Sequence, residues 1–360
     1  MSSKARGLAD LGNAFDDGAL SNRNLIINGA MQVAQRETSV TGVTSGGYYT
    51  CDRWLANIQN GTWTISQEAD APEGFSKSIK YLCTATGAAQ VVQHTQVIEG
   101  ANTQQLAYGT SSAKDITVSF WVKANVTGTY SFRLYNPQGT PRLISQNYTI
   151  NSSGVWEYKT ITLAGDTVRD IADGNGIGIN VAWWLSASST FTTGSYSTVW
   201  QNYASANEAP NQVDVAAAVN NYWQITGVQL EVGDGPATPF EHRFYGDELA
   251  RCQRYYFRHP ASSNTSQFMA QGLANAGGIQ AMVQFPVVMR AIPTAKATVT
   301  NPYWESSPWT LVGSTMTITS ISSGHLSPAG GDFAIFQNNS VVRGTNYNIG
   351  SRDFEFDAEL

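Results

Sequence analysis

The residues best suited to chemistry in this sequence are aromatic side chains in a broken, polar stretch of chain. Tyr303, Trp304 and Trp309 lie beside Pro302 and Pro308, in a segment too short and interrupted to be a core strand. Exposed aromatic rings commonly form contact surfaces, and sugars pack their C–H faces on Trp and Tyr while polar side chains pair with the hydroxyls. The pattern indicates a sugar contact, and its alternative is packing of these rings against the protein or a neighbouring subunit.

A second pair of aromatic residues, Trp200 and Tyr203, lies in the irregular stretch 191–219. An excursion of this length between two strands is often a binding loop rather than a simple connector. We therefore expect Trp200 and Tyr203 to contact the same class of ligand. Residues 214–219 suggest one short helical turn within the excursion.

Three acidic residues, Asp166, Asp170 and Asp173, fall close together in AGDTVRDIADGNG. Calcium takes several oxygen ligands, so these carboxylates could hold a structural calcium ion. Their spacing does not match an EF-hand loop, and a solvated acidic loop is the interpretation that the spacing favours. No other cofactor is expected.

The sequence contains no HExxH motif, no GxSxG elbow, no GKS or GKT phosphate loop and no zinc-type cysteine cluster. A glycosidase needs two carboxylates that flank the scissile bond, and the Asp and Glu residues here are scattered without such a pattern. The repeating strands of a long parallel β-helix, a common scaffold for cutting polysaccharides, are absent. We expect a protein that is not an enzyme.

Composition favours an all-β protein that binds no nucleic acid. Charged residues make up 13% of the 360 residues, with a net charge of −6 and no basic run, whereas phosphate binding needs clustered Lys and Arg. Abundant uncharged polar residues suit strands with one apolar and one polar face. The chain has no apolar run long enough for a membrane span and no secretory signal pattern, so we expect synthesis in a cytoplasm and no membrane insertion.

The three cysteines, Cys51, Cys83 and Cys252, form no CxxC pair and no metal-binding spacing. In a chain folded in a cytoplasm, buried free thiols are favoured. A Cys51–Cys83 bridge between neighbouring strands is the alternative.

Residues 22–243 predict a series of short antiparallel strands with turns between them. The clearest is DITVSFWVK, residues 115–123, which is β-branched and aromatic throughout. Because no helical pattern interrupts the series, the sequence predicts an all-β sandwich. After a glycine-punctuated loop at 42–49, the predicted strands are 53–58, 62–68, 78–84, 90–97, 115–123, 128–135, 156–163, 177–185 and 221–231.

The stretch 221–257 closes one domain and opens another. Its strand stops at Gly233-Asp234-Gly235-Pro236, where glycine permits a positive φ and proline removes a ladder donor. A helix is then predicted over 247–258, with Asp247 as its N-cap. The strands predicted beyond it are 268–272, 278–285, 295–300, 315–321, 333–337 and 353–359.

Several strings in this order resemble one family. VQLEVGDGPATPFEHR (228–243) resembles the last strand and exit of the carbohydrate-binding, jelly-roll-like domain of bacteriophage tail fibre proteins, and NRNLIINGAMQVAQR (22–36) resembles its start. YGDELARCQRYY (245–256) is similar to the connector that follows that domain. FPVVMRAIPT (285–294) and FDAEL (356–360) resemble the fibre's C-terminal segment and terminus.

The resemblance implies two antiparallel β-sandwich, jelly-roll-like domains joined by a short α-helix. It divides the chain into an N-terminal attachment segment, 1–21, a carbohydrate-binding-module-like jelly-roll domain, 22–243, a helical connector, 244–258, and a distal, receptor-binding C-terminal β-sandwich, 259–360. The jelly-roll topology comes from the resemblance, whereas the all-β sandwich comes from the patterning.

The resemblance further implies a non-enzymatic tail fibre protein of the virion that adheres to host cell-surface glycans. Such a protein is a homotrimer, and residues 1–21 would contact other tail or adaptor proteins. One alternative is a capsid or tail decoration protein that uses the same glycan-binding fold. A less favoured alternative is a polysaccharide-degrading tailspike.

Overall fold

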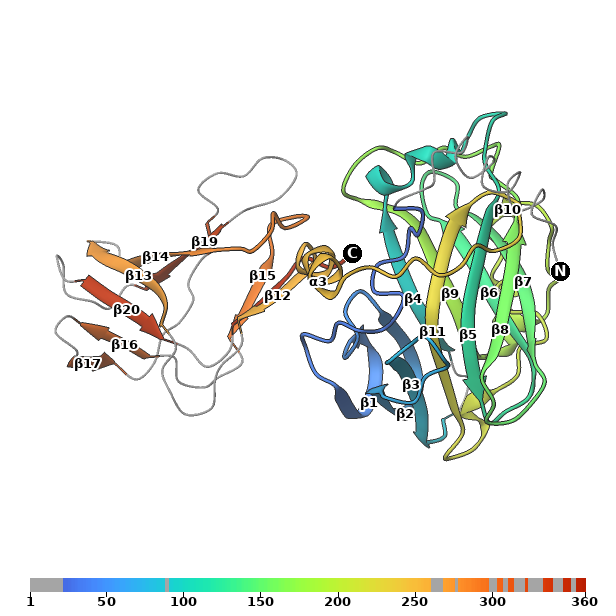
Figure 1. Ribbon diagram of the computed structural model, residues 1–360, viewed down its shortest axis with the longest axis horizontal. Coiled ribbons are helices and arrows are strands. Elements are labelled where there is room, and N and C mark those ends of the chain that lie inside the picture. Colours follow the sequence, from blue (N-terminus) through green and yellow to red (C-terminus); the bar gives the residue numbers. More distant parts are fainter. Residues whose placement is uncertain are drawn as a thin grey trace. The chain divides into compact units, whose positions relative to one another are not determined.

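The computed structural model contains two compact units, Met1–Tyr245 and Gly246–Leu360. Among the described residues of both units, most of the regular secondary structure is antiparallel strand, so the all-β class predicted from the sequence is confirmed (Figure 1). Within the part of the chain that the structure describes, no helix is long and apolar enough to span a membrane. The described residues are 22–87, 91–259, 268–275, 278–297, 303–306, 310–313, 321–322, 333–338, 346–350 and 354–360, with side chains described for 22–87, 91–258, 285–294 and 355–360.

The first unit contains one hydrogen-bonded path of strands, in the order β10-β7-β6-β9-β4-β2-β3-β11-β5-β8, with β1 paired to β2. The path changes layer at β2, which pairs with β4 along 55–59 and with β3 along 62–68. Between these halves, Asn60 and Gly61 have φ values of 71° and 74°, which turn the strand. The strands are β1 (Ser39–Tyr48), β2 (Leu55–Glu68), β3 (Ser78–Ala85), β4 (Val91–Glu99), β5 (Ile116–Ala124), β6 (Gly128–Asn136), β7 (Arg142–Ile150), β8 (Glu157–Leu163), β9 (Ile177–Ala187), β10 (Gln201–Asn202) and β11 (Tyr222–Val232).

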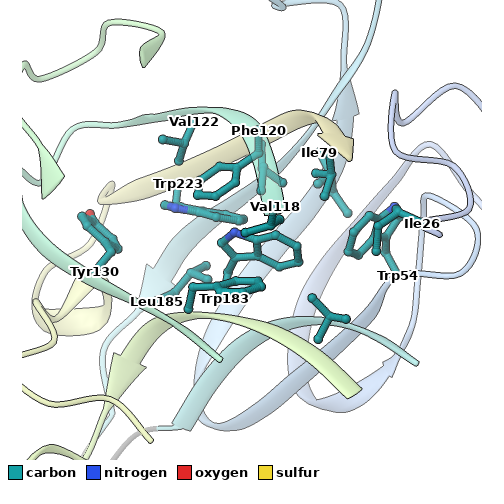
Figure 2. Packing of buried hydrophobic residues seen from close by; sticks show 14 of the residues in the cluster. Ile26, Trp54, Ile79, Val118, Phe120, Val122, Tyr130, Trp183, Leu185 and Trp223 are labelled. Carbon is teal, nitrogen blue, oxygen red and sulfur yellow. The ribbon is translucent and has the colours of Figure 1, made fainter. Parts of the chain in front are cut away.

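The two layers meet in a core rich in aromatic rings. The ring of Phe120 in β5 lies 5.6 Å from that of Trp183 in β9 and 5.1 Å from that of Tyr148 in β7, measured between centroids. Figure 2 shows Phe120, Trp183 and Trp223 gathered in this core. Strands from opposite layers are therefore in contact, and the first unit is a β-sandwich.

His94 of β4 lies inside this aromatic core with no exposed surface. Its ring stacks on Trp54 at 4.3 Å between centroids, and its Nδ1 shares a hydrogen bond of 2.9 Å with the Tyr81 hydroxyl. Burial lowers the pKa of His94 well below its usual value, because the charged imidazolium would lose its hydration. His94 is therefore neutral in the folded protein at physiological pH.

The three cysteines, Cys51, Cys83 and Cys252, are buried and form no disulfide, as the sequence favoured. Burial raises the pKa of the Cys51 thiol, and the neighbouring Asp52 carboxylate adds to the effect. A thiol that stays protonated is a poor nucleophile, so Cys51 serves as a small core residue.

Two segments outside the strands close the first unit: an incoming segment, residues 22–29, and an outgoing segment, residues 233–243. The Glu241 carboxylate accepts hydrogen bonds from the backbone N–H groups of Asn22, at 2.7 Å, and Asn24, at 2.9 Å. Burial opposes ionisation of Glu241, but these N–H donors and the nearby Arg243 charge outweigh it and lower its pKa below the usual value.

Arg243 and Asn24 extend this contact to the last strand. The Arg243 guanidinium donates to the carbonyl oxygens of Asn24 and, at 2.9 Å, of Ile26. The Asn24 side chain donates to Val228 O at 3.1 Å and accepts from Leu230 N at 3.0 Å. Because β3 pairs with only the first half of β11, the incoming segment supplies partners that the second half would otherwise lack.

Most predicted strands of the first unit are confirmed, with three differences. Residues 53–58 and 62–68, predicted as two strands, belong mostly to the single bent strand β2. The predicted loop 42–49 lies largely within β1, where register shifts accommodate the glycines. Strand β7 was not predicted, since Gln146 and Asn147 interrupt its apolar pattern. The predicted turn within 214–219 is confirmed as a 3-10 helix, η4 (Val215–Ala217).

Helix α3 (Tyr245–Gln253) starts at the last residue of the first unit and supplies the first residues of the second. The sequence predicted a helix over 247–258, but Tyr256 and the residues after it form strand β12 (Tyr256–His259), because they pair with β21 (Phe354–Asp357). Two sheets follow, in the orders β12-β21-β15 and β17-β16-β20-β13-β14-β19-β18. The other strands are β13 (Phe268–Asn275), β14 (Gly278–Gln284), β15 (Thr294–Ala297), β16 (Tyr303–Ser306), β17 (Thr310–Gly313), β18 (Ile321–Ser322), β19 (Phe333–Asn338) and β20 (Asn346–Gly350).

Replacing Glu241 by Gln is expected to lower the free energy of unfolding by about 1–2 kcal/mol at pH 7, because two backbone donors lose a charged acceptor. A lowered carboxyl pKa adds stability that is present above the unfolded-state value, near 4.3, and is lost on protonation. The deficit of Glu241→Gln should therefore shrink as the pH falls below about 4. Denaturant unfolding at several pH values measures it, with exposed Glu73→Gln as the control. A constant deficit down to pH 3 would contradict this account.

The neutral, buried His94 predicts a second, separate pH dependence. Its folded-state pKa is lowered, so the unfolded chain binds more protons below about pH 6.5 and stability falls there by up to about 1.4 kcal/mol per pH unit. His94→Phe should remove this slope between pH 6.5 and 5. The variant His242→Asn, at an exposed histidine, should keep it. An unchanged slope in His94→Phe would assign the effect to another group.

Candidate functional site

The long excursion after β9, residues 188–213, lies against the outer face of β6 and β7. The Tyr196 hydroxyl is 2.7 Å from Ser131 Oγ of β6, and Ser145 Oγ of β7 donates to Asn207 O at 2.6 Å. These side chains alternate with the core residues of their strands, so they point away from the core. The excursion is therefore a cover on this face. It contains α2 (Ser189–Thr192), β10 and the 3-10 helix η3 (Ser205–Asn207).

Trp184 holds one end of the excursion by apolar contact. Along β9, Trp183 faces the core and Trp184 faces the opposite side, because successive side chains of a strand point to opposite faces. Trp184 lies 5.1 Å from Phe191 between ring centroids and shares a small cluster with Val91 and Ala209. Because the excursion covers the outer ring, both indoles are fully buried.

A buried ion pair holds the other end. Arg133 Nε lies 2.6 Å from Glu208 Oε2, and the two side chains are only 8% and 6% exposed. Arg133 also donates through Nη1 to Asn180 Oδ1 at 3.1 Å, and its guanidinium lies over the Tyr135 ring, 5.2 Å from the centroid. Removing either charge would leave the other buried and unpaired, so this pair fixes the excursion on the sheet.

Tyr203 is the ring that this arrangement leaves at the surface. It is 41% exposed, its backbone N–H donates to Pro141 O at 2.8 Å, and its ring meets Tyr135 edge to face at 5.4 Å. Partial burial and the nearby Glu208 carboxylate raise the pKa of Tyr203 to about 12. Its hydroxyl therefore stays protonated at physiological pH and donates to the Glu208 carboxylate, which leaves the hydroxyl oxygen as an acceptor. A fixed ring with free surface and a polar tip suits the apolar face and hydroxyls of a sugar.

Trp200, the other aromatic residue predicted in this excursion, lies in the core. It is 6% exposed, its Nε1 donates to Ala164 O at 2.8 Å, and its ring meets Tyr108 edge to face at 5.7 Å. Its polar sequence neighbours suggested exposure, but β10 pairs with β7 and carries Trp200 over the end of the core. The structure therefore brings Tyr203 to the surface without Trp200.

The C-terminal aromatic residues lie partly outside the described residues. Tyr303 and Trp304 belong to strand β16, which pairs with β17 and β20, so the stretch predicted to be broken forms a strand. Trp309 is outside the described residues, as are the side chains of Tyr303 and Trp304, and a sugar contact at these three residues stays a prediction.

The three acidic residues do not come together as one site. Asp166 is fully buried, its Oδ2 accepts from Arg142 Nε at 2.8 Å, and its Oδ1 accepts from Val168 N at 3.0 Å. Asp170 and Asp173 are exposed. In the part of the chain that the structure describes, no group of three His, Cys, Asp or Glu side chains could hold a metal ion. Asp166 thus belongs to a structural ion pair.

No family model matches the chain, and no curated protein matches it. Among solved structures it is similar to the enzymatically active domain of tailspike protein 4 of bacteriophage CBA120, with 15% identity, a TM-score of 0.34, and coverage of 58% of this chain and 21% of that chain. It is also similar to a family 4 carbohydrate-binding module, with 12% identity, a TM-score of 0.30, and coverage of 57% and 97%. A third is the family 11 module of Clostridium thermocellum in complex with a β-1,3-1,4-mixed-linked tetrasaccharide, with 10% identity, a TM-score of 0.26, and coverage of 56% and 98%.

The chain thus matches about a fifth of the length of that tailspike structure. TM-scores this low carry no argument about fold or function. The fold and the candidate site therefore depend on the contacts described above.

The residues that position Tyr203 were not predicted from the sequence. Arg133 and Tyr135 lie in the predicted strand 128–135, on the face opposite to the core residues Phe132 and Leu134. Strand alternation could have placed Arg133 and Tyr135 on one outer face. No sequence signal connects them to Glu208, because 75 residues separate Arg133 from Glu208 along the chain.

Replacing Glu208 by Gln is expected to lower the free energy of unfolding by about 3 kcal/mol, because Arg133 would remain buried without its counter-charge. The double variant Arg133→Met, Glu208→Leu should recover most of this loss, since it removes both charges and restores apolar contact. Denaturant unfolding of the parent, of Arg133→Met and Glu208→Leu alone, and of the double variant measures the coupling free energy between the two side chains. If the loss of unfolding free energy in the double variant equals the sum of the losses in the two single variants, the two side chains do not act as a pair.

Proposed function

We propose that this chain is a non-enzymatic, glycan-binding tail fibre protein of a phage virion that attaches the particle to host cell-surface glycans. The observation that carries the proposal is the partly exposed Tyr203 ring, held edge to face on Tyr135 beside the buried Arg133–Glu208 pair. A ring fixed in advance loses little conformational freedom on binding, which favours affinity. The resemblance of residues 22–36 and 228–243 to the carbohydrate-binding domain of tail fibres supports the same function.

The sugar would pack its C–H face on Tyr203 and donate a hydrogen bond from one of its hydroxyls to the Tyr203 oxygen. The raised pKa of Tyr203, about 12, keeps its hydroxyl protonated and bonded to Glu208 at physiological pH. Binding at this site should therefore show no dependence on pH between 6 and 9 that arises from Tyr203. Recognition of this kind involves contact and no turnover.

Assembly would multiply a weak single contact. We propose a homotrimer located in the virion tail, with residues 1–21 bound to other tail or adaptor proteins and the C-terminal unit distal. Several copies of one modest site, held together, raise the effective concentration of each for a repetitive glycan. A mass near that of one chain in solution at micromolar concentration would contradict the trimer.

The ring of Tyr203 predicts a specific mutational result. Tyr203→Ala should weaken binding of the full chain to host cells about fivefold to tenfold, because one aromatic contact is worth on the order of 1 kcal/mol. Tyr203→Phe keeps the ring and loses only the hydroxyl, so it should lie between the parent and Tyr203→Ala. Binding of labelled protein to whole cells measures the effect, with thermal unfolding as a check on folding. Equal binding by all three proteins would remove Tyr203 from the site.

Two further experiments distinguish the proposed fibre protein from a polysaccharide-degrading enzyme and from a decoration protein. Incubation with host polysaccharide should leave its chain length unchanged, and shortening of the polysaccharide would identify a degrading enzyme. Immunogold labelling of particles should mark the tail. Label spread over the capsid, together with no binding to host cells, would identify a decoration protein and contradict the proposed attachment function.

A further inference from the structure

The other layer of the sandwich has its own outer face, and aromatic residues lie on it. Strands β5 and β8 lie side by side in this layer (Figure 1). Their pairing places Trp121 directly opposite Tyr158. The neighbours of Trp121 along β5, Phe120 and Val122, are fully buried in the core. Trp121 and Tyr158 therefore point away from the core.

Four side chains form a compact block on this face. The Trp121 and Tyr158 rings lie 5.3 Å apart between centroids, tilted by 50°, and Tyr158 is 46% exposed. Two residues further along β5, Lys123 places its ammonium 5.3 Å from the centroid of the Trp156 ring, just before β8. Lys123 and Trp156 thus border the Trp121–Tyr158 pair on one side.

Asp70 reaches this block from the loop between β2 and β3. Its carboxylate accepts from Trp156 Nε1 at 3.2 Å and forms an ion pair with Lys123. The Asp70 side chain is nevertheless 50% exposed, so part of the carboxylate still faces solvent. The block therefore combines partly exposed rings with an oxygen acceptor that is already held in place.

The chemistry of this block selects its ligand. One carboxylate and one ammonium leave it without net charge, which favours an uncharged ligand. The block contains three rings and is bordered along β8 by the exposed hydroxyl residues Thr160 and Thr162. A stable protein interface commonly buries about 800 Å² on each partner and has an apolar centre, which suits this small, polar-bordered block less well than a sugar does.

We propose that Asp70, Trp121, Lys123, Trp156 and Tyr158 form a second glycan-contact site, which takes the ring face of a neutral hexose on Trp121 and Tyr158 and a sugar hydroxyl on Asp70. The inference rests on the proposed glycan-binding function and adds a site on the layer opposite to Tyr203. Two sites on opposite faces would let one chain bridge neighbouring glycan strands, which a single site cannot do.

The test uses the full chain and a panel of immobilised neutral oligosaccharides: glucan, mannan and galactan hexamers. An oligosaccharide that binds is then titrated in solution by calorimetry, which gives the number of sites per chain. The variants are Tyr158→Ala, Tyr158→Phe and Tyr203→Ala. Tyr158 is nearly half exposed, so Tyr158→Ala should fold, and Tyr158→Phe is the matched control because it keeps the ring.

The parent should show two sites per chain. Tyr158→Ala should lose one of them or bind there about tenfold more weakly, Tyr158→Phe should keep both, and Tyr203→Ala should keep the site at Tyr158. Full retention of both sites in Tyr158→Ala, with loss of binding in Tyr203→Ala, would overturn this inference and leave the proposed function in place. A parent that binds no oligosaccharide on the panel would overturn both.

A second copy of the chain is the other molecule that could bind to this face. Sedimentation of the same proteins measures their oligomeric mass and tells a subunit interface from a glycan site. A lower oligomeric mass for Tyr158→Ala than for the parent would assign the rings to a subunit interface and overturn the inference. An unchanged mass together with the loss of one site supports it.

Discussion

The structure of the first unit depends on a set of charge-assisted hydrogen bonds that fasten the incoming and outgoing segments to each other. Glu241 accepts two backbone N–H groups of the incoming segment, and Arg243 donates to two of its carbonyl oxygens. Asn24 then bonds the second half of β11, where β3 no longer pairs. These residues lie in the two strings that resemble the start and exit of the tail fibre domain. The spatial contact explains physically why both strings belong to one module.

The incoming segment thus pairs with the half of β11 that β3 leaves unpaired. The sandwich has two outer faces, and other parts of the chain cover a portion of each. The excursion 188–213 covers one face through the Arg133–Glu208 pair and the Trp184–Phe191 contact, and Tyr203 remains exposed. On the other face, Asp70 in the loop between β2 and β3 contacts Trp156 and Lys123, and the neighbouring Tyr158 stays half exposed. In both places an exposed ring stands beside a charge pair that is already formed. The glycan contacts proposed above use these two positions.

The sequence predicted what local patterning controls and missed what long-range contact controls. The strands β5 and β11 follow from uninterrupted alternation, and the separation of Trp183 from Trp184 follows from the strand period. Strand β7 was missed because polar residues interrupt its pattern, although hydrogen bonds to β6 determine it. Trp200 looked exposed, but the pairing of β10 with β7 buries it. Tyr203 lies at the surface, and its predicted ligand contact stays a prediction. Its partners Arg133 and Glu208 lie 75 residues apart and had no shared signal in the sequence.

The central claim is that the first unit contacts a glycan through two exposed rings, Tyr203 on one outer face and Tyr158 on the other. Amide hydrogen exchange of the full chain, with and without a saturating oligosaccharide that binds it, tests this most directly. The account predicts slower exchange around Tyr203 and around Tyr158, and unchanged exchange at buried positions of β4 such as His94. Saturated binding that leaves exchange near both tyrosines unchanged would contradict the account and place recognition elsewhere in the chain.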